Sequence, residues 1–356
     1  ASMKKVYLET YGCQMNVSDS ERVATALGRD GFEMTTDADK ADVVLINTCS
    51  VREKAEQKLY SQVGRIRHAD RPKPVVGVLG CVAQLEGETL LKKIPGVDFV
   101  IGTRAIGRVA DILGRTINGE DGIVDLGERS DDYDWTVADT HRHSPYVAFL
   151  PIIEGCNKFC TYCIVPFSRG RERSLPADAI IRQTLDLKSR GVREVHLIGQ
   201  NVNSYRPETE DGLDGFAGKS AFSRLLRAVA ATGIERIKFT TSFPRDFHED
   251  IVEAIQTHPN LCNWVHLPVQ SGSNRVLKLM KRGHTIDRYL KQIDRIRSSS
   301  RDIAITTDII VGFPGETEAD FKDTVELVRY CGFDSAYIFK YSPRPGTPAF
   351  EMEDSV

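Results

Sequence analysis

The sequence predicts an α/β protein in which an open parallel α/β sheet domain is followed by a partial (β/α)6 barrel. Apolar strand patterns alternate with helical patterns in two separate series, and an acidic stretch with little apolar periodicity lies between the two. The 356 residues are enough for two domains of ordinary size. We therefore expect a first domain over residues 1–118, a linker over 119–144 and the barrel over 145–356.

The first series alternates short buried strands with amphipathic helices. Strands are expected at residues 5–9, 43–46, 75–79 and 99–101, and helices at 18–29, 53–67 and 85–93. This alternation is typical of a parallel sheet covered by helices. The linker then carries Gly-Glu-Asp-Gly at 119–122 and Ser-Asp-Asp-Tyr-Asp at 130–134, and its charge indicates solvation rather than recognition.

The second series contains six strand–helix units. Strands are expected near residues 147–153, 194–198, 236–240, 264–267, 303–311 and 336–340, with helices that begin near Pro176, Ala221, Asp246, Ser273 and Glu316. Pro176, Pro244 and the turn at 312–317 mark helix starts. Six units predict a partial barrel rather than a closed one of eight strands.

The composition is that of an ordinary globular protein, with 41% hydrophobic and 27% charged residues. No stretch of about eighteen apolar residues predicts a membrane span. The N-terminus lacks the pattern of a signal peptide, and Ala1 and Ser2 precede the expected native start at Met3. We therefore expect a cytoplasmic protein, in which eight cysteines indicate metal binding or catalysis rather than disulfides.

Three cysteines form a C-x3-C-x2-C loop at Cys156, Cys160 and Cys163, just after the first barrel strand. Thiolates bind iron–sulfur clusters and zinc alike, but a structural zinc site closes with four ligands, and no nearby cysteine or histidine completes this one. The loop therefore favours a four-iron cluster with one open iron, with zinc or a redox-inert cluster as the alternative. Tyr162 places an aromatic side chain beside the metal.

Three further cysteines, Cys13, Cys49 and Cys81, each follow one of the first three expected strands. Ligand sites of open α/β sheets lie outside the carboxyl ends of the strands, so three such turns can bring three thiolates together. The alternative is that these cysteines only pack, because free cysteine is often buried. Gly12 and Gly80 favour close approach of the backbone to a bulky ligand, and the pattern predicts a second three-thiolate site.

Polar residues at the carboxyl ends of the barrel strands are candidates for binding a cofactor, because barrel enzymes place their chemistry there. These candidates are Gly199, Gln200, Asn201, Ser242, Gln270, Asp308 and Gly312. Amides and hydroxyls suit ribose, adenine edges and a zwitterionic amino acid. The alternative is that they cap helices or hold turns.

Bulk charge gives no indication of nucleic-acid binding, because the formal net charge is −3. Three local clusters are basic: Arg65, Arg67, His68, Arg71 and Lys73; Arg169, Arg171 and Arg173; and Lys278, Lys281, Arg282 and His284. We interpret such clusters as solvated helix faces or loops. The cluster that follows Cys163 is the exception, because it adjoins the expected reactive site.

The cysteine loop resembles that of the radical S-adenosylmethionine superfamily, and the two triads together resemble its methylthiotransferase family. The resemblance covers essentially the whole chain. Its segments are Glu-Thr-Tyr-Gly-Cys-Gln-Met-Asn at 9–16, Asn-Thr-Cys-Ser-Val-Arg at 47–52, Gly-Cys-Asn-Lys-Phe-Cys-Thr-Tyr-Cys at 155–163, Leu-Ile-Gly-Gln-Asn-Val-Asn-Ser-Tyr at 197–205 and Leu-Pro-Val-Gln-Ser-Gly-Ser at 267–273. Residues 200–203 match best the members that act on dimethylallylated adenosine of tRNA.

The resemblance implies two four-iron clusters, and S-adenosylmethionine as both methyl donor and radical source. One S-adenosylmethionine would methylate a sulfur on the cluster of Cys13, Cys49 and Cys81, and a second would be cleaved at the cluster of Cys156, Cys160 and Cys163. The radical would then open carbon 2 of N-dimethylallyl-adenosine beside the anticodon, where the methylated sulfur attaches. The implied partners are the tRNA anticodon loop, an electron donor and a sulfur source, with no membrane.

Other functions stay open on the sequence alone. One is a methylthiotransferase acting on a ribosomal-protein aspartate or on threonylcarbamoyl-adenosine, and another is a two-cluster electron carrier. The family also carries a small C-terminal β-barrel RNA-binding module, which we do not expect in a sequence ending at Val356. Cys262 and Cys331 lie at helix-to-strand junctions, where inert packing is expected.

Overall fold

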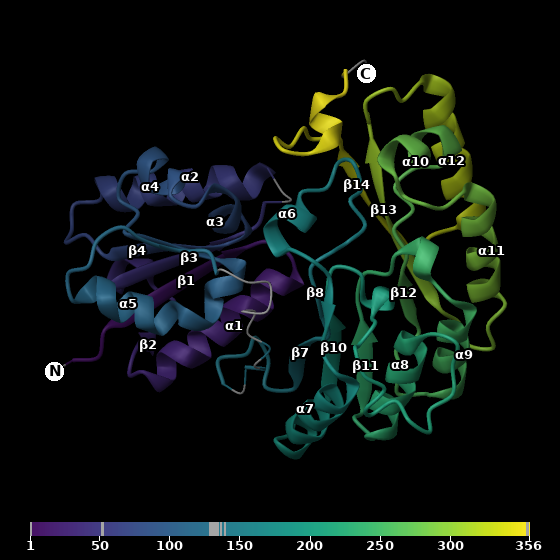
Figure 1. The fold of residues 1–356 in the computed structure, drawn as a ribbon, viewed down its shortest axis with the longest axis horizontal. Coiled ribbons are helices and arrows are strands. Elements are labelled where there is room, and N and C mark those ends of the chain that lie inside the picture. The colour runs from purple at the N-terminus through teal and green to yellow at the C-terminus, as the bar shows by residue number, and fades with distance from the viewer. Residues whose placement is uncertain (1, 51–52, 128–134, 136, 139, 354–355) are drawn as a thin grey trace. The chain divides into compact units, whose positions relative to one another are not determined.

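The structure is a computed structural model that describes residues 2–50, 53–127, 135, 137–138, 140–353 and 356. The chain forms two compact units, residues 1–144 with 165–171 and residues 145–164 with 172–356 (Figure 1). The expected acidic segment at 130–134, and Val51 and Arg52 of the second motif, lie outside the described residues. Within the described part of the chain, no helix is long and apolar enough to cross a membrane.

The first unit is built on a six-stranded sheet in the order β2-β1-β3-β4-β5-β6, with every neighbouring pair parallel. The strands are β1 (Lys5–Tyr11), β2 (Glu33–Met34), β3 (Val43–Thr48), β4 (Val75–Gly80), β5 (Phe99–Gly102) and β6 (Ile123–Asp125). The helices are α1 (Gln14–Arg29), α2 (Glu53–His68), α3 (Cys81–Glu86), α4 (Thr89–Lys93), α5 (Val109–Ile117) and α6 (Val165–Arg169), with a 3-10 helix, η2, at Thr103–Arg108. The open parallel sheet that the sequence predicts is confirmed.

Strand register places the carboxyl ends of three central strands level with one another. Tyr11 pairs with Thr48, and Thr48 pairs with Gly80. The chain leaves β1, β3 and β4 at the same edge of the sheet, so any residues that follow those strands meet there.

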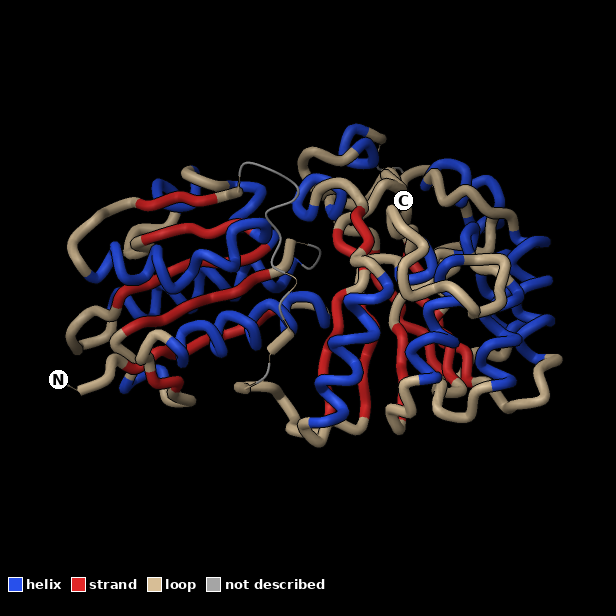
Figure 2. Tube along the Cα trace, turned by 60° about the horizontal axis from the view of Figure 1, so that its bottom comes forward, coloured by secondary structure: helices blue, strands red, loops and turns tan. Residues whose placement is uncertain are grey.

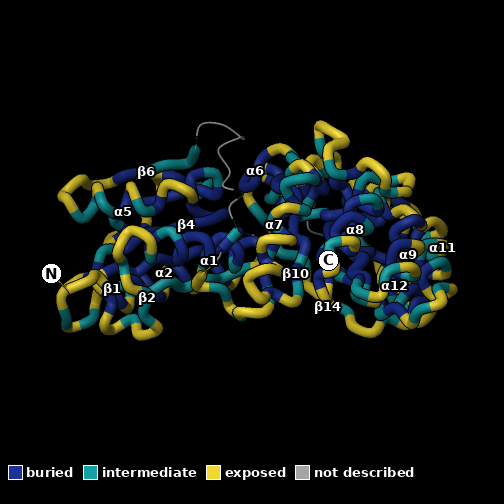
Figure 3. Tube along the Cα trace, turned by 90° about the horizontal axis from the view of Figure 1, so that it is seen from below, coloured by how far each residue is buried: buried dark blue, intermediate teal, exposed yellow. Residues whose placement is uncertain are grey.

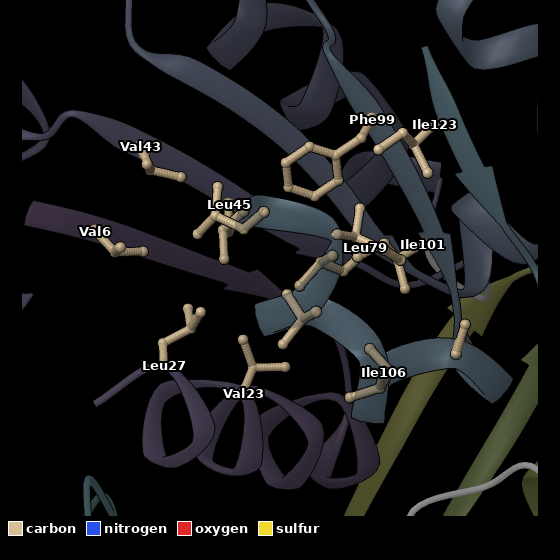
Figure 4. Packing of buried hydrophobic residues seen from close by; sticks show 14 residues of the cluster. Val6, Val23, Leu27, Val43, Leu45, Leu79, Phe99, Ile101, Ile106 and Ile123 are labelled. Atoms are coloured by element: carbon tan, nitrogen blue, oxygen red, sulfur yellow. The ribbon is translucent and has the colours of Figure 1, made fainter. Parts of the chain in front are cut away.

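The core of the first unit lies on both faces of this sheet. All six residues of β3 are buried, as expected for a parallel strand covered by helices on both sides. Figure 4 shows Val23 and Leu27 of α1 beside Val6 and Leu45 of the sheet, with Ile106 of η2 in the same cluster. Figure 3 shows β4 buried and much of the surrounding loop surface exposed.

The helix expected at 85–93 is wrong as a single element. The structure has α3 from Cys81 and a separate α4, because Gly87 ends α3 with a positive φ of 52°. The short edge strands β2 and β6 were not predicted, since two and three residues are too few to show periodicity.

The second unit is a partial barrel of six parallel strands flanked by helices (Figure 2). Its strands are β7 (Val147–Pro151), β10 (Glu194–Ile198), β11 (Arg236–Phe239), β12 (Trp264–His266), β13 (Ala304–Val311) and β14 (Ser335–Lys340), and the short pair β8 (Ile153–Glu154) and β9 (Arg173–Ser174) is antiparallel. A parallel bridge from Ile237 to Leu261 joins the two three-stranded sheets between β11 and β12. The barrel strands therefore follow one another in sequence order.

The barrel helices are α7 (Ala177–Ser189), α8 (Ala221–Ala231), α9 (Glu249–Thr257), α10 (Asn274–Met280), α11 (Ile286–Arg297) and α12 (Glu318–Cys331). Helix α11 was not predicted, although Thr285 caps it by accepting a hydrogen bond from the Arg288 N–H. The helix expected from Asp246 begins at Glu249, after a 3-10 turn at Pro244–Asp246.

Candidate active site: two three-cysteine sites

The first unit brings Cys13, Cys49 and Cys81 together at the carboxyl edge of its sheet. Cys13 caps the N-terminus of α1, Cys49 directly follows β3, and Cys81 is the first residue of α3. The thiols of Cys49 and Cys81 are hydrogen-bonding partners, and Cys13 interacts electrostatically with Cys81. Residues separated by more than thirty positions in the chain therefore lie at one edge of the sheet, and their role as one three-thiolate site stays a prediction.

Two glycines allow this close approach. A Cβ on Gly12 would lie 2.8 Å from the Cβ of Cys49, and a Cβ on Gly80 would lie 2.7 Å from the backbone oxygen of Thr48. Gly80 also has a φ of 99°, which side chains rarely adopt. Any larger residue would push the strand ends apart.

A buried ion pair lies against these thiols. Arg169 Nη1 is 2.9 Å from Asp19 Oδ2, Asp19 also pairs with Arg22, and all three side chains are almost fully buried. Arg169 also hydrogen-bonds to Cys81. The hydrogen bond with Cys49, helped by Arg169 against the effect of burial, lowers the pKa of Cys81. Cys13, by contrast, is exposed at the edge of the sheet.

A polar network that sequence reasoning missed supports the same edge. The Cys13 thiol donates to Asn16 Oδ1 at 3.3 Å, and Asn47 Nδ2 donates to the backbone oxygen of Asn16 and to Ser20 Oγ, each at 2.9 Å. The sequence offered a sign of it, because Asn16 and Asn47 each lie within three residues of a cysteine. A surface hollow lined by Met3 and Arg29 lies at the opposite end of α1 and belongs to no such network.

The second unit holds Cys156, Cys160 and Cys163 on one loop. The amide of Asn201 donates to Cys156 Sγ at 3.3 Å, and the backbone N–H of Lys158 donates to the same sulfur at 3.4 Å. Burial raises the pKa of Cys156 to about 11. The structure therefore places Asn201, a predicted cofactor residue, directly against a cysteine sulfur.

Arg282 corrects the expectation of a solvated basic cluster at 278–284. Its side chain is 5% exposed and that of His284 is 7% exposed. Arg282 Nη1 donates to Cys160 Sγ at 3.5 Å. Sequence reasoning missed this because charged residues in a turn are usually solvated, and no local pattern distinguishes a buried arginine.

Tyr162 packs as part of the second unit's core. Its ring meets that of Phe313 edge to face, with 6.4 Å between centroids, beside Leu277, Met280 and Ala349. The ring therefore anchors the cysteine loop to the barrel.

Three predicted residues at the strand ends carry buried oxygen atoms without hydrogen-bond partners among the described residues: Gln200 Oε1, Ser242 Oγ and Gln270 Oε1. Gln270 also has a φ of 71°, an uncommon backbone conformation for a residue other than glycine. Buried polar atoms normally find partners, so these atoms fit a polar ligand.

The other predicted residues have contacts within the protein. A Cβ on Gly199 would lie 2.2 Å from Ile153 Cγ2, so close packing of the backbone requires glycine there. Asp308 Oδ2 lies 3.2 Å from Nε2 of His266, a residue that sequence reasoning missed. The N–H of Gly312 donates to Glu316 Oε1 at 2.9 Å, and the φ of Gly312 is 75°.

The remaining cysteines lie elsewhere in the barrel. Cys262 precedes β12 and is half-buried, and Cys331 ends α12 and is buried. No three His, Cys, Asp or Glu side chains in the described parts of the chain are arranged around a single metal ion. In a cluster, by contrast, each thiolate binds its own iron atom.

Two family models match the chain. Residues 5–102 match the uncharacterized protein family UPF0004, and residues 150–328 match the radical SAM superfamily. Among solved structures, the radical S-adenosylmethionine methyltransferase TsrM from Kitasatospora setae, with a tryptophan substrate and a SAM analog bound, has a TM-score of 0.69 at 14% identity, over 98% of this chain and 75% of that one. This likeness confirms the fold class.

Curated relatives are far more similar. A tRNA-2-methylthio-N(6)-dimethylallyladenosine synthase from Paracoccus denitrificans is 47% identical over 99% of this chain and 78% of its own length. One from Cereibacter sphaeroides is 48% identical over 99% and 79%. The chain belongs to the radical SAM superfamily and, within it, to the family of the tRNA-2-methylthio-N(6)-dimethylallyladenosine synthases.

Proposed function

We propose that this enzyme converts N-dimethylallyl-adenosine beside the anticodon of tRNA to its 2-methylthio derivative. The observation that carries the proposal is identity of 47% to a synthase of that name over 99% of the chain. Two three-cysteine sites support it, because sulfur insertion needs both a radical source and a sulfur site. The substrate is the anticodon loop of tRNA, whose single-stranded bases can leave their stack to reach a protein site.

The cysteines are proposed as ligands of two four-iron clusters, one held by Cys13, Cys49 and Cys81 and one by Cys156, Cys160 and Cys163. The donor sets fit, since each offers three sulfurs and leaves one iron open. When bound, the clusters and S-adenosylmethionine supply the radical that opens a carbon–hydrogen bond and the sulfur and methyl group that replace the hydrogen.

The chain's own residues would hold and orient these groups. Asn201 and the Lys158 N–H donate to Cys156, and hydrogen bonds to sulfur tune a cluster. The buried oxygen atoms of Gln200, Ser242 and Gln270 would bind polar groups of S-adenosylmethionine. Asp308, Gly312 and Tyr162 are proposed to complete this site in addition to the contacts they make within the protein. An electron donor and a sulfur source complete the reaction, which takes place in the cytoplasm.

Iron and acid-labile sulfide per chain, measured after anaerobic reconstitution, test the two-cluster part. A variant with Cys13, Cys49 and Cys81 all changed to alanine should lose about half of the iron of the unmodified protein. Equal iron in the two proteins would contradict a cluster in the first unit and leave one radical-generating site.

The substrate is tested by mass spectrometry of digested tRNA. Prenylated tRNA should yield the 2-methylthio nucleoside, and unprenylated tRNA should not. Product in a ribosomal-protein peptide, or on threonylcarbamoyl-adenosine alone, would overturn the substrate while leaving the chemistry intact.

A further inference from the structure

Arg282 is directed inward by the backbone that carries it. Lys281 ends α10 in the left-handed conformation, with a φ of 55°, and the Arg282 N–H closes the helix on the Leu277 oxygen at 3.1 Å. Gly283 follows with a φ of 74°. Residues with positive φ on both sides of Arg282 therefore turn this one side chain toward the core, while Lys281 stays exposed.

The guanidinium makes three contacts, none of them to a carboxylate. Nη1 lies 3.5 Å from Cys160 Sγ, Nη2 donates to the Pro268 oxygen at 2.9 Å, and Cζ lies 4.6 Å from the centre of the Phe243 ring. No Asp or Glu of the described residues forms an ion pair with Arg282. A buried charge without an oppositely charged partner is costly, so a counter-charge is expected beside it.

Two other cations at the same ring differ in this respect. Lys158 Nζ and Arg245 Cζ each lie 5.2 Å from the Phe243 centroid. Both reach Asp246, at 2.5 Å and 3.4 Å. Asp246 therefore forms ion pairs with Lys158 and Arg245, whereas the atom of Arg282 nearest a cysteine contacts the sulfur of Cys160.

The cysteine loop is fixed to the turn that carries Arg282. Thr161 donates from its N–H to the Met280 oxygen at 3.0 Å and from its hydroxyl to the Leu279 oxygen at 2.9 Å. The Ala349 N–H donates to the Thr161 oxygen at 2.7 Å. These hydrogen bonds therefore fix the distance between the Arg282 guanidinium and the cysteine loop.

We propose that Arg282 is a positioning residue that supplies the counter-charge of the cluster held by Cys156, Cys160 and Cys163, and that it favours the reduced, more negative form of that cluster. The inference rests on the proposed function, since it needs a cluster in this loop. Gaining one electron adds one negative charge near a fixed cation in a medium of low dielectric constant, where charges interact strongly. Removing the cation therefore makes reduction harder.

The test uses Arg282→Met, which removes the charge and keeps an unbranched apolar side chain, and Arg282→Lys, which keeps the charge. Both are made in the full chain carrying the Cys13, Cys49 and Cys81 triple alanine substitution. The measured signal then comes only from the cluster of the second unit. The reduced fraction is followed by electron paramagnetic resonance in a dithionite titration. Arg282→Met should lower the ratio of reduced to oxidised cluster about tenfold at a set potential, which is about 59 mV for one electron. Arg282→Lys should stay within about threefold.

Two controls separate charge from packing. Arg245→Met removes a cation at the same ring that is paired and half-exposed, and it should change the ratio less than about twofold, as for other exposed pairs. The melting temperature of the cluster-free protein should rise or stay level in Arg282→Met, since an unpaired buried charge is removed. A residue that only packs would lower that temperature and leave the potential alone.

The outcomes are distinguishable. Equal reduction potentials of the cluster in Arg282→Met and in the parent protein would overturn the inference. An equal shift of that potential in Arg282→Met and Arg282→Lys would overturn it too. Absence of any cluster from the parent would instead contradict the proposed function.

Discussion

The cysteines of the first unit come from the ends of three neighbouring strands, whereas those of the second lie within one loop between residues 156 and 163. Each site has a buried arginine at a cysteine sulfur. Arg169 is paired with Asp19, whereas Arg282 has no carboxylate partner among the described residues. Arg169 thus has a carboxylate partner within the protein, whereas for Arg282 we propose that a bound cluster supplies the negative charge.

The comparison predicts that the two sets of cysteines fail in different ways. Cys156→Ala should reduce deoxyadenosine formation from S-adenosylmethionine to background, because the radical source is lost. Cys49→Ala should keep part of that cleavage and lose the methylthio nucleoside. Liquid chromatography of both products checks this, and normal methylthio product from the Cys49→Ala enzyme would contradict two separate roles.

The next largest effect concerns the carboxylate that two buried arginines of the first site share. Asp19→Asn leaves Arg169 and Arg22 buried without their shared carboxylate, and should destabilise the first unit by about 3–5 kcal/mol. Hydrogen exchange of β3 measures this opening. Asp111→Asn removes an exposed pair in the same unit and should cost less than about 0.5 kcal/mol. Similar costs for the two variants would show that the buried pair is unimportant.

A pH dependence belongs to the second unit. Burial, with a contribution from Arg282, lowers the pKa of His284 to about 4 from 6.5. The unfolded state therefore binds the proton first, so His284 contributes stability above pH 6.5 that is lost as the pH falls through about 4. The loss amounts to about 3 kcal/mol.

His284→Phe should flatten this dependence between pH 7 and pH 4. Urea unfolding is followed by Trp264 fluorescence in a Trp135→Phe background, which leaves one tryptophan in the second unit. An unchanged pH slope would show that other groups govern acid stability.

The smallest predicted effect tests how tightly the strand ends meet. Gly12→Ala puts a Cβ within 2.8 Å of Cys49 Cβ and should cost about 1–3 kcal/mol and part of the iron of the first site. Gly114→Ala, in α5 with open space around it, should instead stabilise the unit by about 0.5–1 kcal/mol. Thermal unfolding and iron content check both, and equal effects would mean that the approach of Gly12 to Cys49 is unimportant.

Much of the fold followed from periodicity. The strand at 194–198 matches β10 in full, and β3 and β4 differ from expectation only at their carboxyl ends. Predicted helix boundaries were wrong where a single residue ends a helix, as Gly87 does between α3 and α4. The limits of the linker, at 118 and 144, stay a prediction.

The sequence by itself determined the alternation of strands and helices, both cysteine triads and the family, because these features follow from the local spacing of residues and from short motifs. Only the tertiary structure decided which of several arginines are buried at sulfur. Arg169 and Arg282 lie among other basic residues that stay exposed or half-exposed, such as Arg171 and Lys281. The burial of Arg169 depends on its contact with Asp19, and that of Arg282 depends on its contacts with Cys160 and Phe243. These contacts join residues far apart in the chain, so no local pattern records them.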